Sequence, residues 1–152
     1  MAEADCAFCA IVSGGARAHE VCRGNGVVAF LDHSPLFEGH VLVVPDEHFE
    51  TLADLPTQRI AAYFAEVQRI SAALPAALGC TGSFVAMNNI VSQSVPHLHT
   101  HVVPRTRGDG LRGFFWPRTR YESDDSAART AAAIATTLGA TRRGRQGGRP
   151  QR

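Results

Sequence analysis

The chain has 152 residues, of which 45% are hydrophobic and 19% charged, a composition typical of one globular domain. No apolar run reaches the ~18 residues that a membrane-spanning helix needs, and the acidic start Met1–Asp5 is unlike a secretion signal. We therefore expect a cytoplasmic protein that does not enter a membrane. The formal net charge is +1, but five arginines follow residue 141, so the body is acidic and we expect no specific nucleic-acid binding.

The first half of the chain predicts two strands and a long helix. A short N-terminal segment, 6–15, precedes two β-branched runs, 27–31 and 41–44, which predict buried strands. A helix is predicted to open at Asp54–Pro56 and to end at Pro75 and Gly79. Its expected apolar face consists of Ile60, Phe64, Val67, Ile70 or Ser71, and Leu74.

The second half predicts two more strands, at 83–87 and 98–103, and an alanine-rich helix at 124–138. Strands in succession, with two helices apart from them, predict an α+β fold with an antiparallel sheet. We expect a single domain over residues 1–141. The Arg/Gly-rich tail, 142–152, is predicted to be disordered.

Three histidines occupy alternate positions in His97-Leu98-His99-Thr100-His101. Alternation is the period of a β-strand, so the three imidazoles are expected on one side, roughly 6.5 Å apart. Imidazole serves as nucleophile, proton carrier or metal ligand near neutral pH. The cluster therefore predicts a working site rather than a structural core.

The stretch from Gln93 to Arg105 resembles the histidine-triad (HIT) family, whose motif alternates three histidines with apolar residues. The resemblance covers about residues 5–121 and includes Cys6-x-x-Cys9, residues 29–32, residues 39–45 and His48. It implies a small α+β fold with one long central helix and a C-terminal helix. It also implies a homodimer that binds nucleotides and reacts at the α-phosphate.

The resemblance implies that His99 is the nucleophile, which forms a covalent nucleotidyl-histidine intermediate. His101 and Ser94 would contact the phosphate or the leaving group. Transferase branches carry glutamine at the third triad position, so His101 favours hydrolysis of a nucleoside phosphoramidate or a dinucleoside polyphosphate. A nucleotidyl transferase, a nucleotide-binding regulatory protein with little turnover and a zinc-stabilised scaffold remain as alternatives.

A purine nucleotide would be bound by Asp32, Phe30, Leu31, Asn88 and Gln93, again by resemblance. Asp32 would accept the ribose hydroxyls, although such an aspartate can instead cap its own turn, and Phe30 can be a core residue. The family reads Asn-x-Gly and then Gly-Gln before Ser or Thr. This chain is two residues shorter from Asn88 to Ser94 and has neither glycine, so Asn89 is as good a candidate as Asn88.

Cys6-x-x-Cys9 has the spacing of half a zinc site. Some HIT branches complete it with the residues that correspond to His48 and His97. Such a closed Cys2His2 set would hold a structural zinc ion. The alternative is two reduced thiols that pack as small apolar groups.

The segment after the triad combines arginines with aromatic residues. Arg105, Arg107 and Arg112 suit contact with a polyphosphate or leaving group. Phe114 and Trp116 suit packing at a subunit interface.

Overall fold

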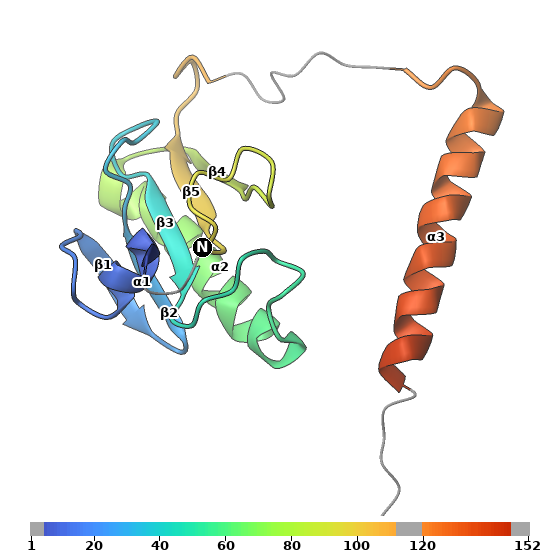
Figure 1. Cartoon of the computed structure of the whole chain (residues 1–152). Helices are drawn as coiled ribbons and strands as arrows, with labels where there is room; N and C mark the ends of the chain where they lie inside the picture. The colour runs from blue at the N-terminus through green and yellow to red at the C-terminus, as the bar shows by residue number, and fades with distance from the viewer. Residues whose placement is uncertain (1–4, 112–119, 147–152) are drawn as a thin grey trace, which may run out of the picture. The chain divides into compact units, whose positions relative to one another are not determined.

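The structure is a computed structural model that describes residues 5–111 and 120–146, with side chains to residue 137. It divides into two compact units, one up to Leu111 and one from Arg112 onward, which are described separately. In the first unit five strands form one antiparallel sheet in the order β1-β2-β3-β5-β4 (Figure 1), which confirms the predicted α+β class. The strands are β1 Glu20–Gly24, β2 Val27–Leu31, β3 Val41–Pro45, β4 Gly82–Ala86 and β5 Thr100–Arg105.

The edge strand β1 is an element that the sequence analysis missed. It forms a hairpin with β2 through Asn25 and Gly26, whose φ angles are 55° and 77°. Positive φ at both positions and an Asn-Gly pair are the features of a two-residue hairpin turn. The Asn-Gly signal was present in the chain, but the polar strand before it has no apolar run.

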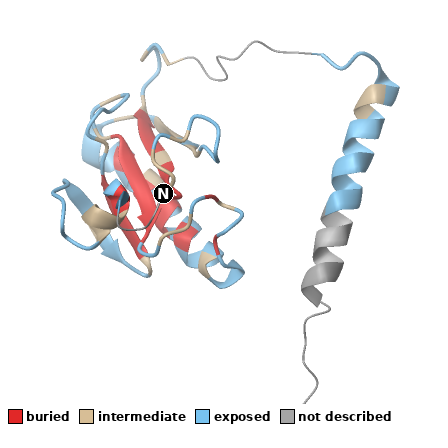
Figure 2. Ribbon diagram, in the orientation of Figure 1, coloured by how far each residue is buried: buried red, intermediate tan, exposed pale blue. Residues whose placement is uncertain are grey.

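The two faces of the sheet are covered by different helices (Figure 1). Helix α2, Thr57–Leu78, packs on one face with Val27, Ala29 and Val43. The short helix α1, Ala7–Val12, puts Phe8 on the other face with Val28 and Phe30. Because both faces are covered, β2 and β3 are buried almost throughout (Figure 2), which explains their continuous apolar sequences.

Helix α2 ends before Gly79 as predicted, but Pro75 does not end it, and its buried face differs in part from the prediction. It continues through Pro75 and ends at Leu78, before Gly79 in the left-handed conformation with φ 69°. A proline removes one backbone hydrogen bond, a loss confined to the last turn. Of the predicted face, Val67, Ile70 and Leu74 are buried, whereas Ile60 and Phe64 are 38% and 37% exposed. Tyr63 and Glu66 complete the buried face.

The second unit contains helix α3, Asp124–Gln146, in which the Ser123 hydroxyl accepts a hydrogen bond from the Ser126 amide at 3.1 Å. The predicted start at Asp124 is confirmed. The predicted end at Leu138 is wrong, and residues 142–146 of the tail that was expected to be disordered are helical, since Arg and Gln favour helices. Among the described residues, no helix has the length and apolar character needed to span a membrane.

Candidate functional site

The three triad side chains lie on the α1 face of the sheet, as their alternation predicts. Strand β5 begins only at Thr100, but the alternation extends before it, since Leu98 and Val102 belong to the core under α2. His97 and His99 are buried, and the rings of His99 and His101 lie 5.0 Å apart, centroid to centroid. The His99 and His101 imidazoles are therefore neighbours, whereas the His97 ring lies against His48.

The ring orientation of His99 follows from a single hydrogen bond. Its Nδ1 lies 2.7 Å from the backbone carbonyl oxygen of His97. A carbonyl oxygen only accepts, so Nδ1 carries the proton and donates it. In the neutral ring the lone pair is then on Nε2, which is the nitrogen available for attack.

His101 is held in the opposite tautomer by His40, a residue to which the sequence analysis gave no role. The Leu36 amide donates to His40 Nδ1 at 3.2 Å, so the proton of a neutral His40 lies on Nε2. His40 Nε2 in turn lies 2.9 Å from His101 Nδ1 and donates to it. The Nε2–H of His101 is therefore left to donate to a ligand.

Both of these histidines favour the neutral form. Burial, with smaller contributions from His99 and His40, lowers the pKa of His101 to about 4. Burial also lowers the pKa of His40, although Asp32 opposes the shift. At neutral pH the His40–His101 pair is therefore uncharged, and His101 Nε2–H is the group that donates to a ligand.

Asp32 lies directly after β2 and next to this histidine pair. Its carboxylate accepts a 2.8 Å hydrogen bond from the Ser34 amide, so it does cap its own turn. Its other oxygen lies 3.6 Å from His40 Nδ1, which is too long for a hydrogen bond. A carboxylate has further acceptor capacity, so capping and ligand binding are compatible.

Phe30 is a core residue that also borders the site. It is 2% exposed and packs edge-on against Phe8, with centroids 5.4 Å apart. Phe8 in turn meets His99 at 5.2 Å. Across the sheet Phe30 pairs with Leu42, and Leu42 with His101, while Leu31 ends the strand half-exposed.

The second cluster consists of Cys6, Cys9, His48 and His97, whose ligand atoms all lie within 4.8 Å of one another. His97 Nδ1 is 3.5 Å from each sulfur, and His48 Nδ1 is 3.3 Å from Cys9 Sγ. A tetrahedral zinc ion holds its sulfur and nitrogen ligands about 3.5 Å apart. The cluster therefore has the dimensions of a tetrahedral metal site.

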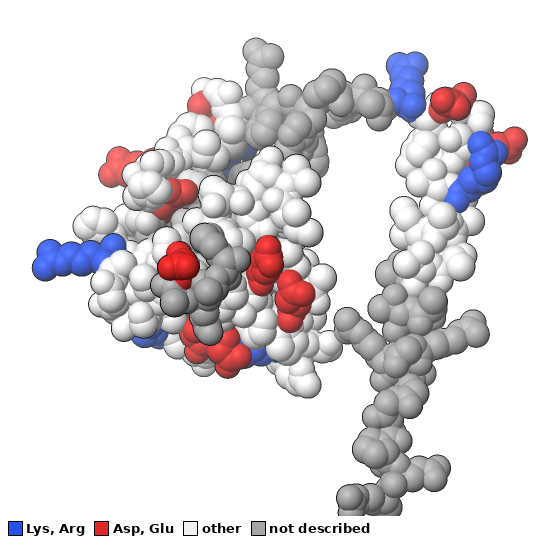
Figure 3. Space-filling view, viewed as in Figure 1, with Lys and Arg blue, Asp and Glu red and all other residues white. Residues whose placement is uncertain are grey.

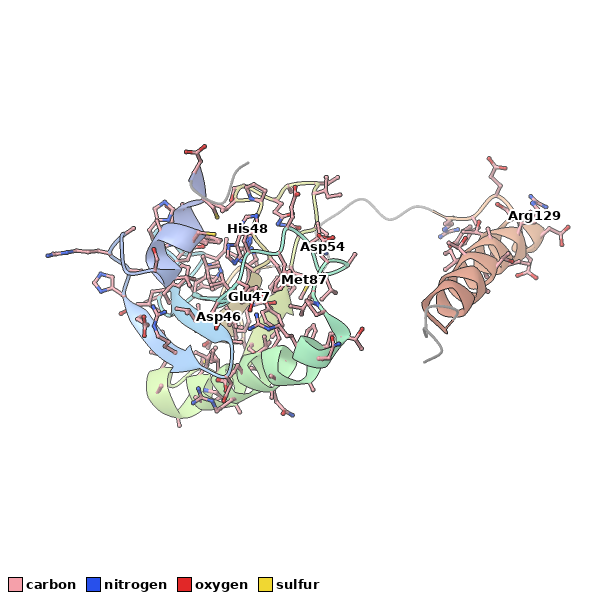
Figure 4. The ribbon with its side chains drawn as sticks, turned by 60° about the horizontal axis from the view of Figure 1, so that its bottom comes forward. Asp46, Glu47, His48, Asp54, Met87 and Arg129 are labelled. Carbon is pink, nitrogen blue, oxygen red and sulfur yellow. The ribbon has the colours of Figure 1, made fainter. Side chains whose placement is uncertain are left out.

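Other contacts prepare these side chains for a metal. His97 Nε2 donates to the Pro45 carbonyl at 3.1 Å, which leaves the lone pair on Nδ1, the atom that faces the sulfurs. Burial lowers the pKa of His97 to about 4, so the ring is neutral. His48 follows Asp46 and Glu47 (Figure 4), which are ion-paired with Arg59 of α2 at 3.0 and 3.1 Å. The residues present fit a structural zinc ion.

Comparisons with known proteins agree with this geometry. The family model described as the HIT domain matches residues 14–108. The chain belongs to the HIT family. A HIT-like protein of Methanocaldococcus jannaschii is 36% identical over 107 residues, which are 69% of this chain and 82% of that protein.

Two further HIT proteins bear on the chemistry. The adenosine 5′-monophosphoramidase of Schizosaccharomyces pombe is 32% identical over 114 residues, 74% of this chain and 83% of its own. The crystal structure of a zinc-bound histidine triad family protein from Mycobacterium smegmatis is 36% identical, with a TM-score of 0.68 over 91% of this chain and 99% of that one. A nucleotide-related function is thus supported for this HIT protein.

The shortened loop before the triad is braced by the residues expected to bind the nucleotide. Asn88 Nδ2 donates to the Ser92 carbonyl at 3.2 Å. The Gln93 amide accepts from the Ile90 backbone and donates to the Glu50 carbonyl, both at 2.7 Å. Ser94 is exposed, and its hydroxyl makes no hydrogen bond to any residue that the structure describes. Of these expected contacts, Ser94 is therefore the one most available to a ligand.

Of the arginines after the triad, Arg105 forms an ion pair and a hydrogen bond with residues close to it in sequence. Its guanidinium pairs with Asp109 and donates to the Leu111 carbonyl. Asp109 is held ionised, because the hydrogen bond from Arg105 lowers its pKa to about 2. Arg112, Phe114 and Trp116 lie outside the described residues.

Proposed function

We propose that this HIT protein is a nucleotide hydrolase that acts at the α-phosphate of a nucleoside phosphoramidate or a dinucleoside polyphosphate. The observation that carries the proposal is the opposite tautomers of His99 and His101. One presents a lone pair at Nε2, and the other presents an N–H at Nε2. Nucleophilic displacement at phosphorus needs both a nucleophile and a donor to the phosphate oxygens. The phosphoramidase activity named for the fission-yeast relative supports this class.

In the first step His99 Nε2 attacks the α-phosphorus, and the bond from phosphorus to the leaving nitrogen or oxygen breaks. The leaving group keeps the electron pair and takes a proton from the Ser94 hydroxyl. His101 Nε2–H donates to a phosphate oxygen throughout. In the second step water attacks phosphorus and gives one proton to the Ser94 oxygen, the bond to Nε2 breaks, and the nucleoside monophosphate leaves with His99 and Ser94 restored.

The nucleoside is assigned to the β2 end of the site, where Asp32 would accept the ribose hydroxyls. Phe30 and Leu31 would border a purine base, with Phe30 acting from within the core. Asn88 and Gln93 act through the loop that they brace rather than through free amides. Losing affinity for AMP on the change Asp32→Ala would support the nucleoside assignment.

The first experiment compares wild type with His99→Asn on adenosine 5′-phosphoramidate and on a diadenosine polyphosphate. We expect kcat/KM to fall at least about 1,000-fold, because the nucleophile is removed. Rapid denaturation of the wild type during turnover should yield a peptide with AMP on His99, found by mass spectrometry. His19→Asn, at an exposed position outside the site, is the matched control.

Retained turnover in His99→Asn would overturn the catalytic assignment. AMP binding without turnover by the wild type would favour the regulatory alternative. AMP transfer to an added phosphate acceptor in preference to water would favour a transferase.

The same proposal includes a structural zinc ion on Cys6, Cys9, His48 and His97. The ligand distances and the zinc-bound mycobacterial relative support it. Bound there, the ion would tie α1 to the segment that carries His97. His97 would then hold His99 through its carbonyl while its ring is anchored.

We also assign a homodimer that forms along the edge strand β4, and a cytoplasmic location. The other edge, β1, contains a bulge and the ion pair Glu20–Arg23, features that discourage edge pairing. Strand β4 has no charged residue and leaves Val85 43% exposed. On the face drawn in Figure 3, acidic side chains are prominent on the sheet unit, so the expected partners do not include specific nucleic acids.

A further inference from the structure

The triad departs from the histidine-triad motif at Thr100, where an apolar residue is expected between His99 and His101. The Thr100 side chain is fully buried. It alternates with Leu98 and Val102, which belong to the core under α2, so it lies on the face of the sheet opposite the triad rings. A hydroxyl removed from water needs a hydrogen-bond partner, because its burial otherwise costs free energy.

The partner of Thr100 is a tyrosine of α2, and the two hydroxyls form a chain of hydrogen bonds with one direction. Tyr63 Oη lies 2.8 Å from Thr100 Oγ1 and 2.9 Å from the Val43 carbonyl oxygen. Tyr63 has a single proton and a carbonyl can only accept, so Tyr63 donates to Val43 and Thr100 donates to Tyr63. Burial raises the pKa of Tyr63, so its hydroxyl keeps the proton at neutral pH. We call this chain, from Thr100 through Tyr63 to Val43, the hydroxyl bridge.

The hydroxyl bridge lies where the pairing of β3 with β5 ends. Val43 and Thr100 form the last pair of that ladder. His101 lies inside the paired stretch, whereas His99 lies one residue before it. Strand pairing therefore fixes the backbone of His101 directly, but that of His99 only through Thr100.

The segment that carries His99 has one further anchor before it. The Leu98 amide donates to the Phe49 carbonyl at 2.6 Å. His99 thus lies between that bond and the hydroxyl bridge. The last pair of a ladder opens more readily than the pairs inside it. Without the bridge, the pair at Thr100 would open more often, and His99 would move relative to a bound phosphate.

We propose that Tyr63 and Thr100 are positioning residues for the nucleophile His99, and that they act from the face of the sheet opposite the substrate. The inference rests on the proposed hydrolase and deepens it. An error of about 1 Å in the placement of a reacting group can lower a rate about 100-fold. The nucleoside contact assigned to Asp32 follows β2 and does not involve the bridge. Loss of the bridge should therefore affect kcat more than KM.

The test uses two substitutions of Thr100 that separate its hydroxyl from its shape. Thr100→Val removes the hydroxyl and keeps the branched side chain, whereas Thr100→Ser keeps the hydroxyl. On adenosine 5′-phosphoramidate we expect kcat to fall at least about tenfold in Thr100→Val, with KM changed by less than about twofold. Thr100→Ser should retain at least about half of the wild-type kcat, since the bridge is kept.

The tyrosine is tested in the same assay. Tyr63→Phe should lower kcat as Thr100→Val does. The double variant Tyr63→Phe/Thr100→Val leaves no hydroxyl unpaired, and it should be no slower than the slower single variant, because the two hydroxyls act as one unit. Losses that multiply in the double variant would contradict the proposal.

A second hydroxyl pair provides the matched control. Ser71 of α2 and Ser83 of β4 lie 2.6 Å apart, oxygen to oxygen, so they join the same helix to the same sheet. Ser83 pairs with Pro104, at the other end of β5 from the triad. Ser71→Ala should therefore lower stability without lowering kcat. A wild-type kcat in Thr100→Val, or an equal loss of kcat in Ser71→Ala, would overturn the inference.

NMR spectroscopy separates this inference from the proposed activity. The Nδ1 proton of His99 donates to a backbone carbonyl, so it should give a low-field proton resonance that is absent from His99→Asn. We expect this proton to exchange with water at least about tenfold faster in Thr100→Val than in wild type, and at the wild-type rate in Thr100→Ser and Ser71→Ala. That result supports the inference even if wild type turns over no substrate. Equal exchange in wild type and Thr100→Val contradicts it, whatever the turnover.

Discussion

At the scale of the residue, each triad histidine has its role set by hydrogen bonds that begin at a backbone group, which can only donate or only accept. The Pro45 carbonyl leaves Nδ1 of His97 for a metal. The His97 carbonyl leaves Nε2 of His99 for attack. The chain from the Leu36 amide through His40 leaves a proton on Nε2 of His101. Three identical side chains thus present three different atoms to their partners.

Burial of His101 predicts that acid destabilises the protein. Its pKa is about 4 when folded, against about 6.5 when unfolded, so the unfolded chain binds the proton first as pH falls. Stability present above pH 6.5 is therefore lost progressively down to pH 4. Urea unfolding at pH 7.0 and 4.5 should show a loss about 2 kcal/mol smaller in His101→Gln than in wild type.

The candidate metal ligands Cys6, Cys9, His48 and His97 are the same in both proteins, so their own pH dependence cancels in that comparison. His33→Gln is the control, because the His33 side chain is 95% exposed. Equal losses in wild type and His101→Gln would show that burial of His101 does not contribute to the acid sensitivity.

At the scale of the element, α1 cannot be stable by itself. It has six residues, and its N-cap, Cys6, makes no side-chain capping hydrogen bond. Isolated helices of this length do not form in water. Phe8 packing and the thiols of Cys6 and Cys9 therefore hold α1 against the sheet, and Phe8 then forms a wall of the His99 site.

Removing the metal should loosen α1 before the sheet. Protein purified without chelator should contain about one zinc per chain, and chelation should lower the thermal midpoint by about 10 °C or more. Hydrogen exchange should show faster loss of protection at the Ala10 amide, bonded to Cys6, than in β3. Cys22→Ser, outside the cluster, should behave as wild type. Near-zero zinc, with no change on chelation, would contradict the metal assignment.

At the scale of the whole molecule, the two edges of the sheet differ in what they allow. Strand β1 is bulged and carries charges, whereas β4, of the same length, is uncharged and regular. An edge strand with unpaired backbone groups pairs readily with another strand unless a bulge or charged side chains prevent it. We propose a second copy of this chain as the partner of β4.

Val85→Lys should therefore convert a dimer to a monomer, because the charge would be brought into the β4 interface. Sedimentation equilibrium measures the change, and we expect the dimer dissociation constant to rise at least about 100-fold. Val21→Lys places the same charge on β1 and should leave the dimer intact. A monomeric wild type, or dissociation by Val21→Lys alone, would contradict the β4 assignment.

Much of the fold was predictable because strand and helix periods are local properties of the chain. The β-branched runs of β2 and β3, the helix capped by Gly79 and the alternation of the triad all follow from neighbouring residues. The prediction of the buried face of α2 was wrong in part, because contacts with residues distant in sequence determine which side chains of the helix are buried. Tyr63 rather than Phe64 is buried because its hydroxyl donates to the Val43 carbonyl, at 2.9 Å, and meets Thr100.

The sequence by itself determined that the three histidines share one side of the sheet, and its motifs identified the family and the candidate ligands. Only the tertiary structure decided the tautomers, the part played by His40 and the use of Gln93 as a brace. Several of those features depend on hydrogen bonds between residues far apart in sequence, such as Gln93 with Glu50, 43 positions apart, and His40 with His101, 61 positions apart. The bonds from His99 to His97 and from Leu36 to His40 span two and four positions, and no periodicity of side chains reveals them. The alternation of residues along a strand specifies the face on which a side chain lies. Which ring nitrogen of a histidine carries the proton depends on the hydrogen-bond partners that the folded chain places beside it.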